Sequence, residues 1–334
     1  MRLGKISDSV LKRSVLKQIR TKRQEVLNGA GIGEDCAIFA PSAGLASAVS
    51  QAAVPGEEDM ARVLVKCANN LATAGARPVA VLLTLLLPPQ AEELLLRQLM
   101  AAAENTCHVL EMQIAGGHTT VSPHVDCPMA CVTAYGIPMQ GVDTDIALSP
   151  MFTTRGAKPG QDIVLTKWIG LEGTAILARR NRERLLERYP AHLVEEAAGF
   201  DRYLSIIPEA AAAVKSGIRV MHDASEGGIL ASLWELAESS GVGLTIDLRK
   251  IPIRQETVEV CELCGVNPYM LASSGCLVMA ADHGEGLVEK LARERIPAAV
   301  IGRITDSHDR LIYNAEEKRY LDKPAQDEIY KYID

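Results

Sequence analysis

The stretch Val79-Ala80-Val81-Leu82-Leu83-Thr84-Leu85-Leu86-Leu87, followed by Pro88-Pro89, decides the fold of the first half of the chain. Nine residues with one polar side chain have the length of a buried strand and fall far short of the roughly 20 apolar residues that cross a bilayer. Proline has no N–H to donate, so the pair ends the strand. We therefore predict a buried strand over 79–87 and no membrane span.

Hydrophobic spacing on either side of this strand predicts strands and helices in alternation. The expected elements are strand 45–51, helix 57–75, helix 91–110, and strands 112–115 and 127–135. Glu57, Glu58 and Asp59 place negative charge at the positive end of the first helix, which favours its start there. The order strand-helix-strand-helix-strand-strand predicts an α+β, ferredoxin-like domain whose sheet is covered by helices on one face.

The periodicity lapses between Gly136 and Gly160, where three prolines occur. We place the domain boundary there, with a first domain over 1–150 and a second over 151–334. The second half predicts an α/β sandwich with strands 163–166, 243–246, 276–280 and 298–304 and helices 174–188, 203–216, 228–239 and 286–294.

Composition excludes several classes of function. The chain has 334 residues, and its 35 Lys+Arg against 42 Asp+Glu give a net charge of −7 with no long basic run, so a nucleic-acid-binding face is not expected. No secretory signal is visible and the eight cysteines are scattered, which predicts a cytoplasmic protein with reduced thiols. Cys261 and Cys264 have CxxC spacing but supply only two of the four ligands of a structural zinc site, so we interpret them as packed side chains of a helix.

Two turns of the first half contain residues suited to ligand binding. Gly31-Ile32-Gly33-Glu34-Asp35-Cys36-Ala37 carries two carboxylates, which could ligate Mg²⁺ or accept hydrogen bonds from loop amides. Gly116-Gly117-His118-Thr119-Thr120 carries paired glycines, which would let the backbone approach a ligand closely. A tight turn with a solvated histidine explains the second motif equally well.

Two turns of the second half combine glycine with charge at the start of a predicted helix. Asp223-Ala224-Ser225-Glu226-Gly227-Gly228 offers a carboxylate beside helix N–H groups, although an N-cap with Glu226 in a capping box is an equal alternative. Lys167 precedes the turn Gly170-Leu171-Glu172-Gly173-Thr174, which could hold a phosphate. Each motif alone is a weak indication.

Taken in chain order with Asn69–Pro78 (NNLATAGARP) and Asn267–Gly275 (NPYMLASSG), these motifs resemble the aminoimidazole ribonucleotide synthetase superfamily. That superfamily includes the hydrogenase-maturation dehydratase, thiamine-monophosphate kinase and selenophosphate synthetase. The resemblance extends from about Gly31 to Ile304 and is strongest to the hydrogenase-maturation type.

The resemblance implies N-terminal domains paired in a dimeric β-barrel, ATP in the cleft between domains, and Mg²⁺ bridging its phosphates. The implied reaction is ATP-dependent phosphorylation of an oxygen, which needs carboxylates to hold the metal. The resemblance assigns the metal to Asp35 and Asp223. It assigns the nucleotide to Glu34, Asp35, Asn70, Gly116, Gly117, His118, Thr119, Lys167, Gly173, Thr174, Asp223, Glu226, Gly227 and Gly228.

This chain departs from the family pattern at three acids. Ser-Thr-Asp-Pro is replaced by Ser50-Gln51-Ala52-Ala53, Asn-Asp-Leu-Ala by Asn69-Asn70-Leu71-Ala72, and the acid of the Gly-Gly-(Asp/Glu)-Thr motif by His118. Amides and histidine are poor magnesium ligands, so we expect a depleted, weakened Mg²⁺ site and a shift of phosphate contacts toward the second domain. The chain ends Tyr330-Lys331-Tyr332-Ile333-Asp334, without the terminal cysteine of the hydrogenase-maturation enzymes, so their carboxamide chemistry is not expected.

Two functional hypotheses follow. The first is an ATP-binding enzyme that phosphorylates an oxygen of a small molecule or protein carboxamide and uses the retained Glu34, Asp35 and Asp223. The second is a catalytically degenerate family member that serves as a nucleotide-binding or regulatory homodimer. Either would be a homodimer, because helices on one side leave the hydrophobic faces of the first-domain strands partly uncovered. The sequence does not specify the substrate.

Overall fold

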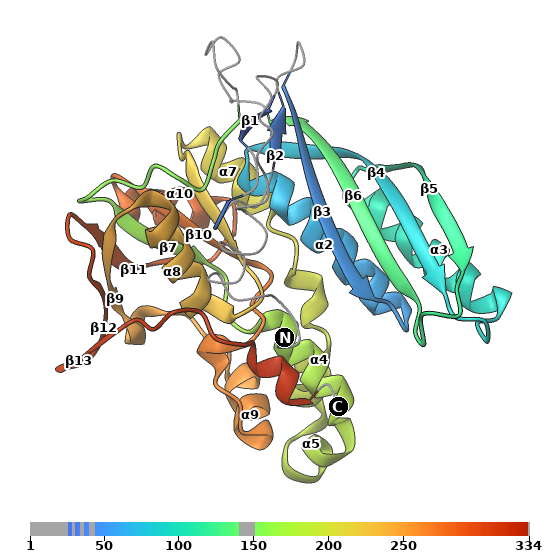
Figure 1. The fold of residues 1–334 in the computed structure, drawn as a ribbon. Helices are drawn as coiled ribbons and strands as arrows, with labels where there is room; N and C mark the ends of the chain where they lie inside the picture. Colours follow the sequence, from blue (N-terminus) through green and yellow to red (C-terminus); the bar gives the residue numbers. More distant parts are fainter. Residues whose placement is uncertain (1–25, 29–30, 34–36, 40–43, 140–150, 333–334) are drawn as a thin grey trace. The chain divides into compact units, whose positions relative to one another are not determined.

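The computed structural model describes residues 26–28, 31–33, 37–39, 44–139 and 151–332 (Figure 1). These residues form two compact units, which divide between Met151 and Phe152. Residues 31–33 cluster with the second unit, although their place in the sequence put them in the first predicted domain. Within the described residues, no helix is long and apolar enough to cross a membrane.

The first unit is a six-stranded sheet with two described helices. Its strands have the order β1-β2-β3-β6-β4-β5, and β4 and β5 form its parallel pair. The elements are β1 (Val26–Asn28), β2 (Ala37–Phe39), β3 (Leu45–Ala53), α2 (Glu57–Thr73), β4 (Ala76–Leu87), α3 (Glu93–Val109), β5 (Gln113–Val121) and β6 (Met129–Pro138). The predicted strands and helices are present. The prediction of a ferredoxin-like topology was wrong. A ferredoxin-like unit runs βαββαβ, whereas this unit runs βαβαββ from β3 to β6, and β6 inserts between β3 and β4.

The sheet of the first unit buries one face against α2 and α3 (Figure 1). Val63, Leu64, Cys67 and Leu71 recur at helical spacing on α2 and are buried. On the opposite face, Val49 of β3 is 59% exposed and Leu82 of β4 is 38% exposed. Both residues pair with Thr133 of β6 and therefore point to the same side of the sheet. This side exposes the apolar side chains of Val49 and Leu82, and neither α2 nor α3 covers it.

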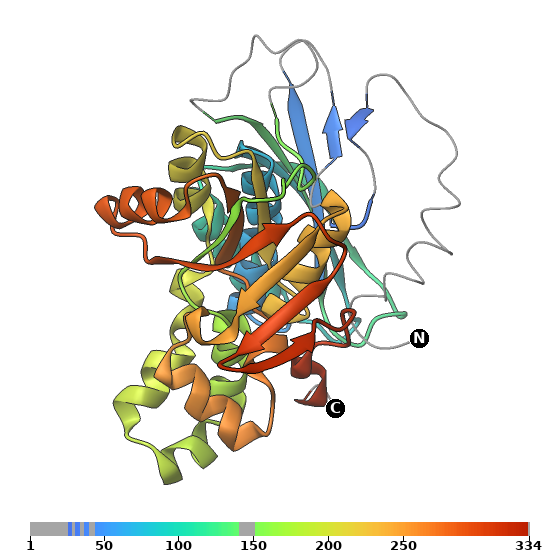
Figure 2. The ribbon, with the colours of Figure 1, turned by 90° about the vertical axis from the view of Figure 1, so that its left-hand side faces the viewer.

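The second unit is built on a seven-stranded sheet of order β13-β12-β9-β11-β7-β10-β8, in which β9 and β12 are parallel (Figure 2). Its strands are β7 (Asp162–Thr166), β8 (Val220–Ala224), β9 (Gly243–Asp247), β10 (Cys276–Ala281), β11 (Ala298–Thr305), β12 (Arg310–Asn314) and β13 (Glu317–Tyr320). Its helices are α4 (Leu171–Arg180), α5 (Arg182–Arg188), α6 (Ala191–Ala198), α7 (Ile207–Lys215), α8 (Gly228–Ser240), α9 (Gln255–Cys264) and α10 (Gly284–Arg293). Short 3₁₀ helices are η3 (Phe200–Tyr203), η4 (Leu248–Lys250), η5 (Pro268–Met270) and η6 (Glu328–Tyr332).

Both units are mixed α+β structures, and the second differs from its prediction in several places. The helix predicted over 174–188 is divided into α4 and α5 at Asn181. The hairpin of β12 and β13 was not predicted, because β13 is exposed along its whole length and has no apolar alternation.

Cys261 and Cys264 lie in α9 and are buried in a hydrophobic cluster, where burial raises the pKa of the Cys261 thiol to about 12. These two cysteines are packing residues, as expected.

Glycine at position 302 lets β11 pack against β9. A Cβ added at Gly302 would lie 2.2 Å from the carbonyl oxygen of Thr245. We predict that Gly302→Ala lowers the free energy of unfolding by about 1–3 kcal/mol, because the backbone of β9 must move. The matched change Gly286→Ala, at an exposed position of α10 with no neighbour closer than 3.9 Å, should raise it by about 0.5–1 kcal/mol. Chemical denaturation checks both, and equal effects would contradict this account.

Candidate functional site

The turn Asp223–Gly228 connects the end of β8 to the start of α8. Gly227 and Gly228 both have left-handed backbone, with φ of 85° and 68°. A Cβ at Gly228 would lie 2.5 Å from the carbonyl oxygen of Tyr269. Glycine is therefore required here because a second loop, from η5 to β10, packs directly against the first turn of α8.

That second loop, Leu271–Gly275, also holds the start of α4. The N–H of Gly173 donates to the carbonyl of Ala272 (2.9 Å), and the N–H of Gly170 donates to Ser273 Oγ (2.8 Å). The N–H of Ser273 in turn donates to the carbonyl of Ser225 (3.1 Å). Two motifs that are far apart in the sequence thus meet at the loop 271–275 within the second unit. They are the turns 170–174 and 223–228.

Asp327 fixes this arrangement, and sequence reasoning missed it. Its carboxylate accepts backbone hydrogen bonds from Gly227 (2.6 Å), Ile329 (2.8 Å) and Ala272 (3.2 Å). Burial raises the pKa of the Asp327 carboxyl to about 6; the N–H groups of Ile329 and Gly227 lower it, and the nearby Glu172 and Glu226 charges raise it. No sequence signal marked the residue, because it lies in an aperiodic segment after Pro324.

Carboxylates gather around the starts of α4 and α8. Glu172, in the first turn of α4, is buried and accepts a hydrogen bond from Ser274 Oγ (2.7 Å). Asp223 is also buried, 3% exposed, at the end of β8. Tyr330 has a raised pKa, because its ring is partly buried and the negative charge of Glu226 is close. Helix N-termini stabilise such negative charges, so the fold can hold an acid-rich site at this place.

Lys167 has structural contacts of its own. Its ammonium donates to the carbonyls of Tyr203 (2.8 Å) and Ser205 (2.6 Å) and forms an ion pair with Glu209 (2.7 Å). The side chain is 7% exposed, and its backbone is left-handed at φ 52°. An ammonium has three donors, and three protein oxygens surround this one. The contacts give Lys167 a role in joining β7 to η3 and α7, and its predicted contact with a phosphate stays a prediction.

His222, next to Asp223, serves to anchor α8. Its Nε2 lies 2.9 Å from Glu235 Oε2, and both side chains are buried. The sequence left open whether His222 orients the Asp223 carboxylate or bonds to backbone. The structure gives it a third partner, on the helix that follows.

In the first unit, Gly116–Thr120 is part of strand β5 and not a turn at the end of a shorter strand. Gly117 is approached by its neighbouring strand, since a Cβ there would lie 1.8 Å from the carbonyl oxygen of Leu83. The glycine therefore allows the backbone of β4 to pair closely with β5. The prediction that a ligand approaches this backbone has no support from that contact.

The three positions of the depleted acids do not lie on one face of the sheet. His118 is in register with Thr84, which pairs with Cys131, so all three point to the open face. Ala52 directly follows the residue of β3 that pairs with Cys131. Its side chain therefore points to the opposite face of the sheet, which α2 and α3 cover. Asn70 lies half-buried on α2, on that same side of the sheet. The suggestion of a depleted magnesium site formed by these positions stays a prediction.

Two predicted site residues, Glu34 and Asp35, lie outside the described residues. Within the part of the chain that the structure describes, no group of three or more His, Cys, Asp or Glu side chains is arranged to hold a metal ion. Asp223 alone does not make an oxygen-ligand site for Mg²⁺, which needs several ligands. The assignment of a metal to Asp35 and Asp223 therefore stays a prediction.

Comparison with known families agrees with this arrangement of motifs. The model of the AIR synthase related protein N-terminal domain matches residues 33–138, and that of its C-terminal domain matches residues 158–314. The chain belongs to the AIR synthase related protein family. Together the two matched segments contain every predicted nucleotide-binding residue.

Relatives and solved structures of the family span most of this chain. The carbamoyl dehydratase HypE of Rhodobacter capsulatus is 28% identical over 244 residues, which cover 72% of this chain and 68% of the relative. The hydrogenase maturation protein HypE in complex with ATP has a TM-score of 0.71 at 20% identity and covers 98% of this chain and 97% of its own. AaThiL complexed with AMPPCP and TMP has a TM-score of 0.72 at 18% identity and covers 96% and 99%. At these identities the two solved structures show the fold alone.

The raised pKa of Asp327 predicts an unusual dependence of stability on pH. Its folded pKa of about 6 lies above the ordinary 3.8, so ionised Asp327 opposes folding above pH 6, and this penalty disappears as the pH falls from 6 to 4. Relative to Asp327→Asn, the wild-type free energy of unfolding should rise by about 1–3 kcal/mol between pH 8 and pH 4. Urea denaturation at each pH measures it. The exposed Asp322→Asn is the control and should show no such rise; a constant difference for Asp327→Asn contradicts the assignment.

Proposed function

We propose that this protein binds ATP and transfers its terminal phosphoryl group to an oxygen of a small molecule or a protein carboxamide. Membership of the AIR synthase related protein family supports the proposal, as does the ATP complex of HypE, which shares the fold. The observation that carries it is the meeting of 170–174 and 223–228 at the loop 271–275. These are the second-unit motifs by which the sequence resembles ATP-dependent enzymes.

The second unit would contribute two helix starts and a set of carboxylates. The starts of α4 and α8 present backbone N–H groups and positive dipole ends, which bind phosphate oxygens. The N–H groups of Gly170, Gly173 and Gly227 already donate within the protein, so the phosphate contacts of this proposal fall to other groups of these turns. A divalent cation that arrives with the ATP would neutralise part of the charge of its phosphates.

The proposal predicts one ATP site per chain, with Asp223 part of it. Isothermal titration calorimetry should show ATP binding in the presence of Mg²⁺, and Asp223→Asn should weaken it roughly tenfold or more through loss of one charged contact. The matched change Asp306→Asn, on an exposed turn far along the chain, should leave the affinity unchanged. Circular dichroism of both variants excludes unfolding.

Formation of ADP from ATP in the presence of candidate acceptors separates the two functional hypotheses. Turnover that Asp223→Asn reduces supports the enzyme. Binding with no turnover, across the candidate acceptors tried, supports the regulatory homodimer. No ATP binding, or equal binding by wild type and Asp223→Asn, contradicts the proposed site.

We also propose that the chain forms a homodimer through the open face of the first unit's sheet. Val49 and Leu82 expose apolar area on that face, and the adjacent edge strand β5 is largely exposed. An uncovered apolar face next to an unpaired strand edge favours association. A second copy of the same face would bury both.

The dimer proposal predicts that a charge at the centre of this face separates the subunits. Leu82→Glu should shift the mass measured by light scattering at micromolar concentration from dimer toward monomer, because a buried unpaired carboxylate is costly. Val109→Glu places the same charge at a 78% exposed position at the end of α3 and should leave the dimer intact. A monomeric wild-type protein, or a Leu82→Glu variant that remains fully dimeric, contradicts the proposal.

A further inference from the structure

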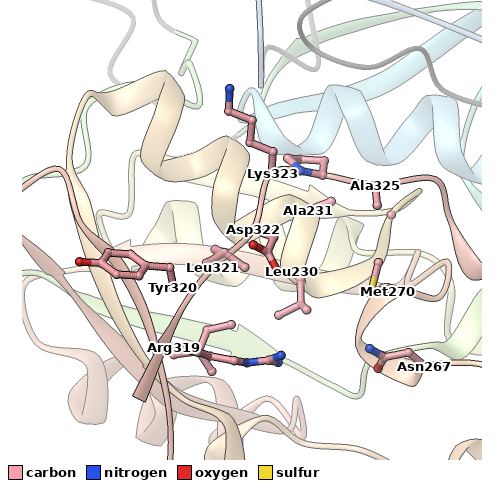
Figure 3. A pocket seen from close by; sticks show the side chains of 13 residues that line it. Leu230, Ala231, Asn267, Met270, Arg319, Tyr320, Leu321, Asp322, Lys323 and Ala325 are labelled. Atoms are coloured by element: carbon pink, nitrogen blue, oxygen red, sulfur yellow. The ribbon is translucent and has the colours of Figure 1, made fainter. Parts of the chain in front are cut away.

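The second unit contains a pocket whose lining shares one residue, Gly227, with the predicted nucleotide-binding residues. It lies between the start of α8, the loop before η5, and the segment that follows β13 (Figure 3). Its volume is about 160 Å³. A cavity of about 150 Å³ holds one benzene molecule, so this pocket has room for a single compact group.

The floor of the pocket is apolar. Ala231 of α8, Ile312 of β12 and Leu321 are buried lining residues, and the partly buried Leu230 and Met270 extend the apolar wall. These side chains offer no hydrogen-bonding group to a ligand. The floor therefore suits a branched aliphatic or small ring substituent, which gains from leaving water.

The rim of the pocket is polar and carries a cation without a partner. The guanidinium of Arg319, on β13, makes no hydrogen bond or ion pair with another described residue, and Figure 3 shows the side chain extended below Leu230 in the direction of Asn267. Lys323 extends away from the other labelled side chains in the same view. Asp322 lines the pocket as well, so the three ionisable residues together carry a charge of +1.

This charge and shape discriminate between anions. A rim of +1 suits a singly charged group better than a phosphate, which carries close to two charges at neutral pH. The planar guanidinium of arginine matches the two oxygens of a carboxylate with parallel hydrogen bonds. The Asn267 amide at the same rim offers further hydrogen-bonding capacity.

We propose that this pocket binds a carboxylate attached to one compact apolar group, with the carboxylate on Arg319 and the apolar group on Ala231, Ile312 and Leu321. Two sources share this chemistry: a free branched carboxylic acid, and the C-terminal residue of a peptide. The proposal does not depend on ATP binding, because Arg319, Ala231, Ile312 and Leu321 are not predicted nucleotide-binding residues, although Gly227 of the predicted nucleotide turn also lines the pocket.

Calorimetric titration of the full chain tests the proposal with four probes. They are 4-methylpentanoate, its neutral analogue 4-methylpentanamide, the peptide Gly-Gly-Gly-Leu with a free C-terminus, and the same peptide amidated. We expect one or both acids to bind and both amides to bind at least roughly tenfold more weakly, because only the acids pair with the guanidinium. Binding of the free acid alone assigns the pocket to a small molecule, and tighter binding of the peptide acid assigns it to a chain terminus.

Three exposed variants of β13 keep the test independent of folding. Arg319→Gln should weaken the binding of the acid roughly tenfold, and Arg319→Lys should weaken it less, because the charge remains. Lys318→Gln removes the same charge from the adjacent residue, whose side chain points to the other face of the strand, and should change nothing. Absence of binding at millimolar concentration, equal binding of acid and amide, or equal loss in Arg319→Gln and Lys318→Gln would overturn the proposal.

Discussion

The second unit depends on one buried carboxylate. Asp327 accepts hydrogen bonds from the N–H groups of Gly227, Ala272 and Ile329, and so joins the start of α8, the loop before β10 and the 3₁₀ helix η6. Each of these N–H groups would otherwise need another acceptor, because a buried donor left without one costs about 1–3 kcal/mol. The loop that Asp327 holds also accepts hydrogen bonds from α4, so the position of both helix starts follows from this contact.

The electrostatics of the site follow from the same arrangement. Asp327 is buried close to Glu172 and Glu226, and the ammonium of Lys167 is held by oxygens of Tyr203, Ser205 and Glu209. A group of acids around helix N-termini is stable as long as the helix dipoles and buried donors compensate for it. Such a group attracts cations.

The sequence predicted much of the fold because its signals were local. The apolar run of nine residues before Pro88 became most of β4, and the acidic start at Glu57 became the first turn of α2. The glycine motifs at 170–174 and 223–228 lie at helix starts, as their spacing indicated. Each of these features is set by residues within about ten positions of one another.

What the sequence did not predict depends on contacts between distant segments. The insertion of β6 between β3 and β4 and the parallel pairing of β5 with β4 depend on the order of strands in the sheet. The sequence predicted a ligand next to Gly117, and the structure places the backbone of Leu83 there. Strand register separates Ala52 from His118 onto opposite faces of the sheet, although both were assigned to one site. Asp327 was missed because a carboxylate in an aperiodic segment carries no sign of the amides, about 55 and 100 residues away in sequence, that it binds.

Amide hydrogen exchange of an Asp327→Ala variant tests the central claim most directly. If the carboxylate holds the three segments together, the amides of Gly227, Ala272 and Ile329 should exchange at least roughly tenfold faster in the variant, because each loses its acceptor and the local opening costs less. The amides of the central strands β7 and β10 should keep their wild-type rates. Unchanged exchange at Gly227 and Ala272, or equal acceleration at every amide of the second unit, would contradict the account.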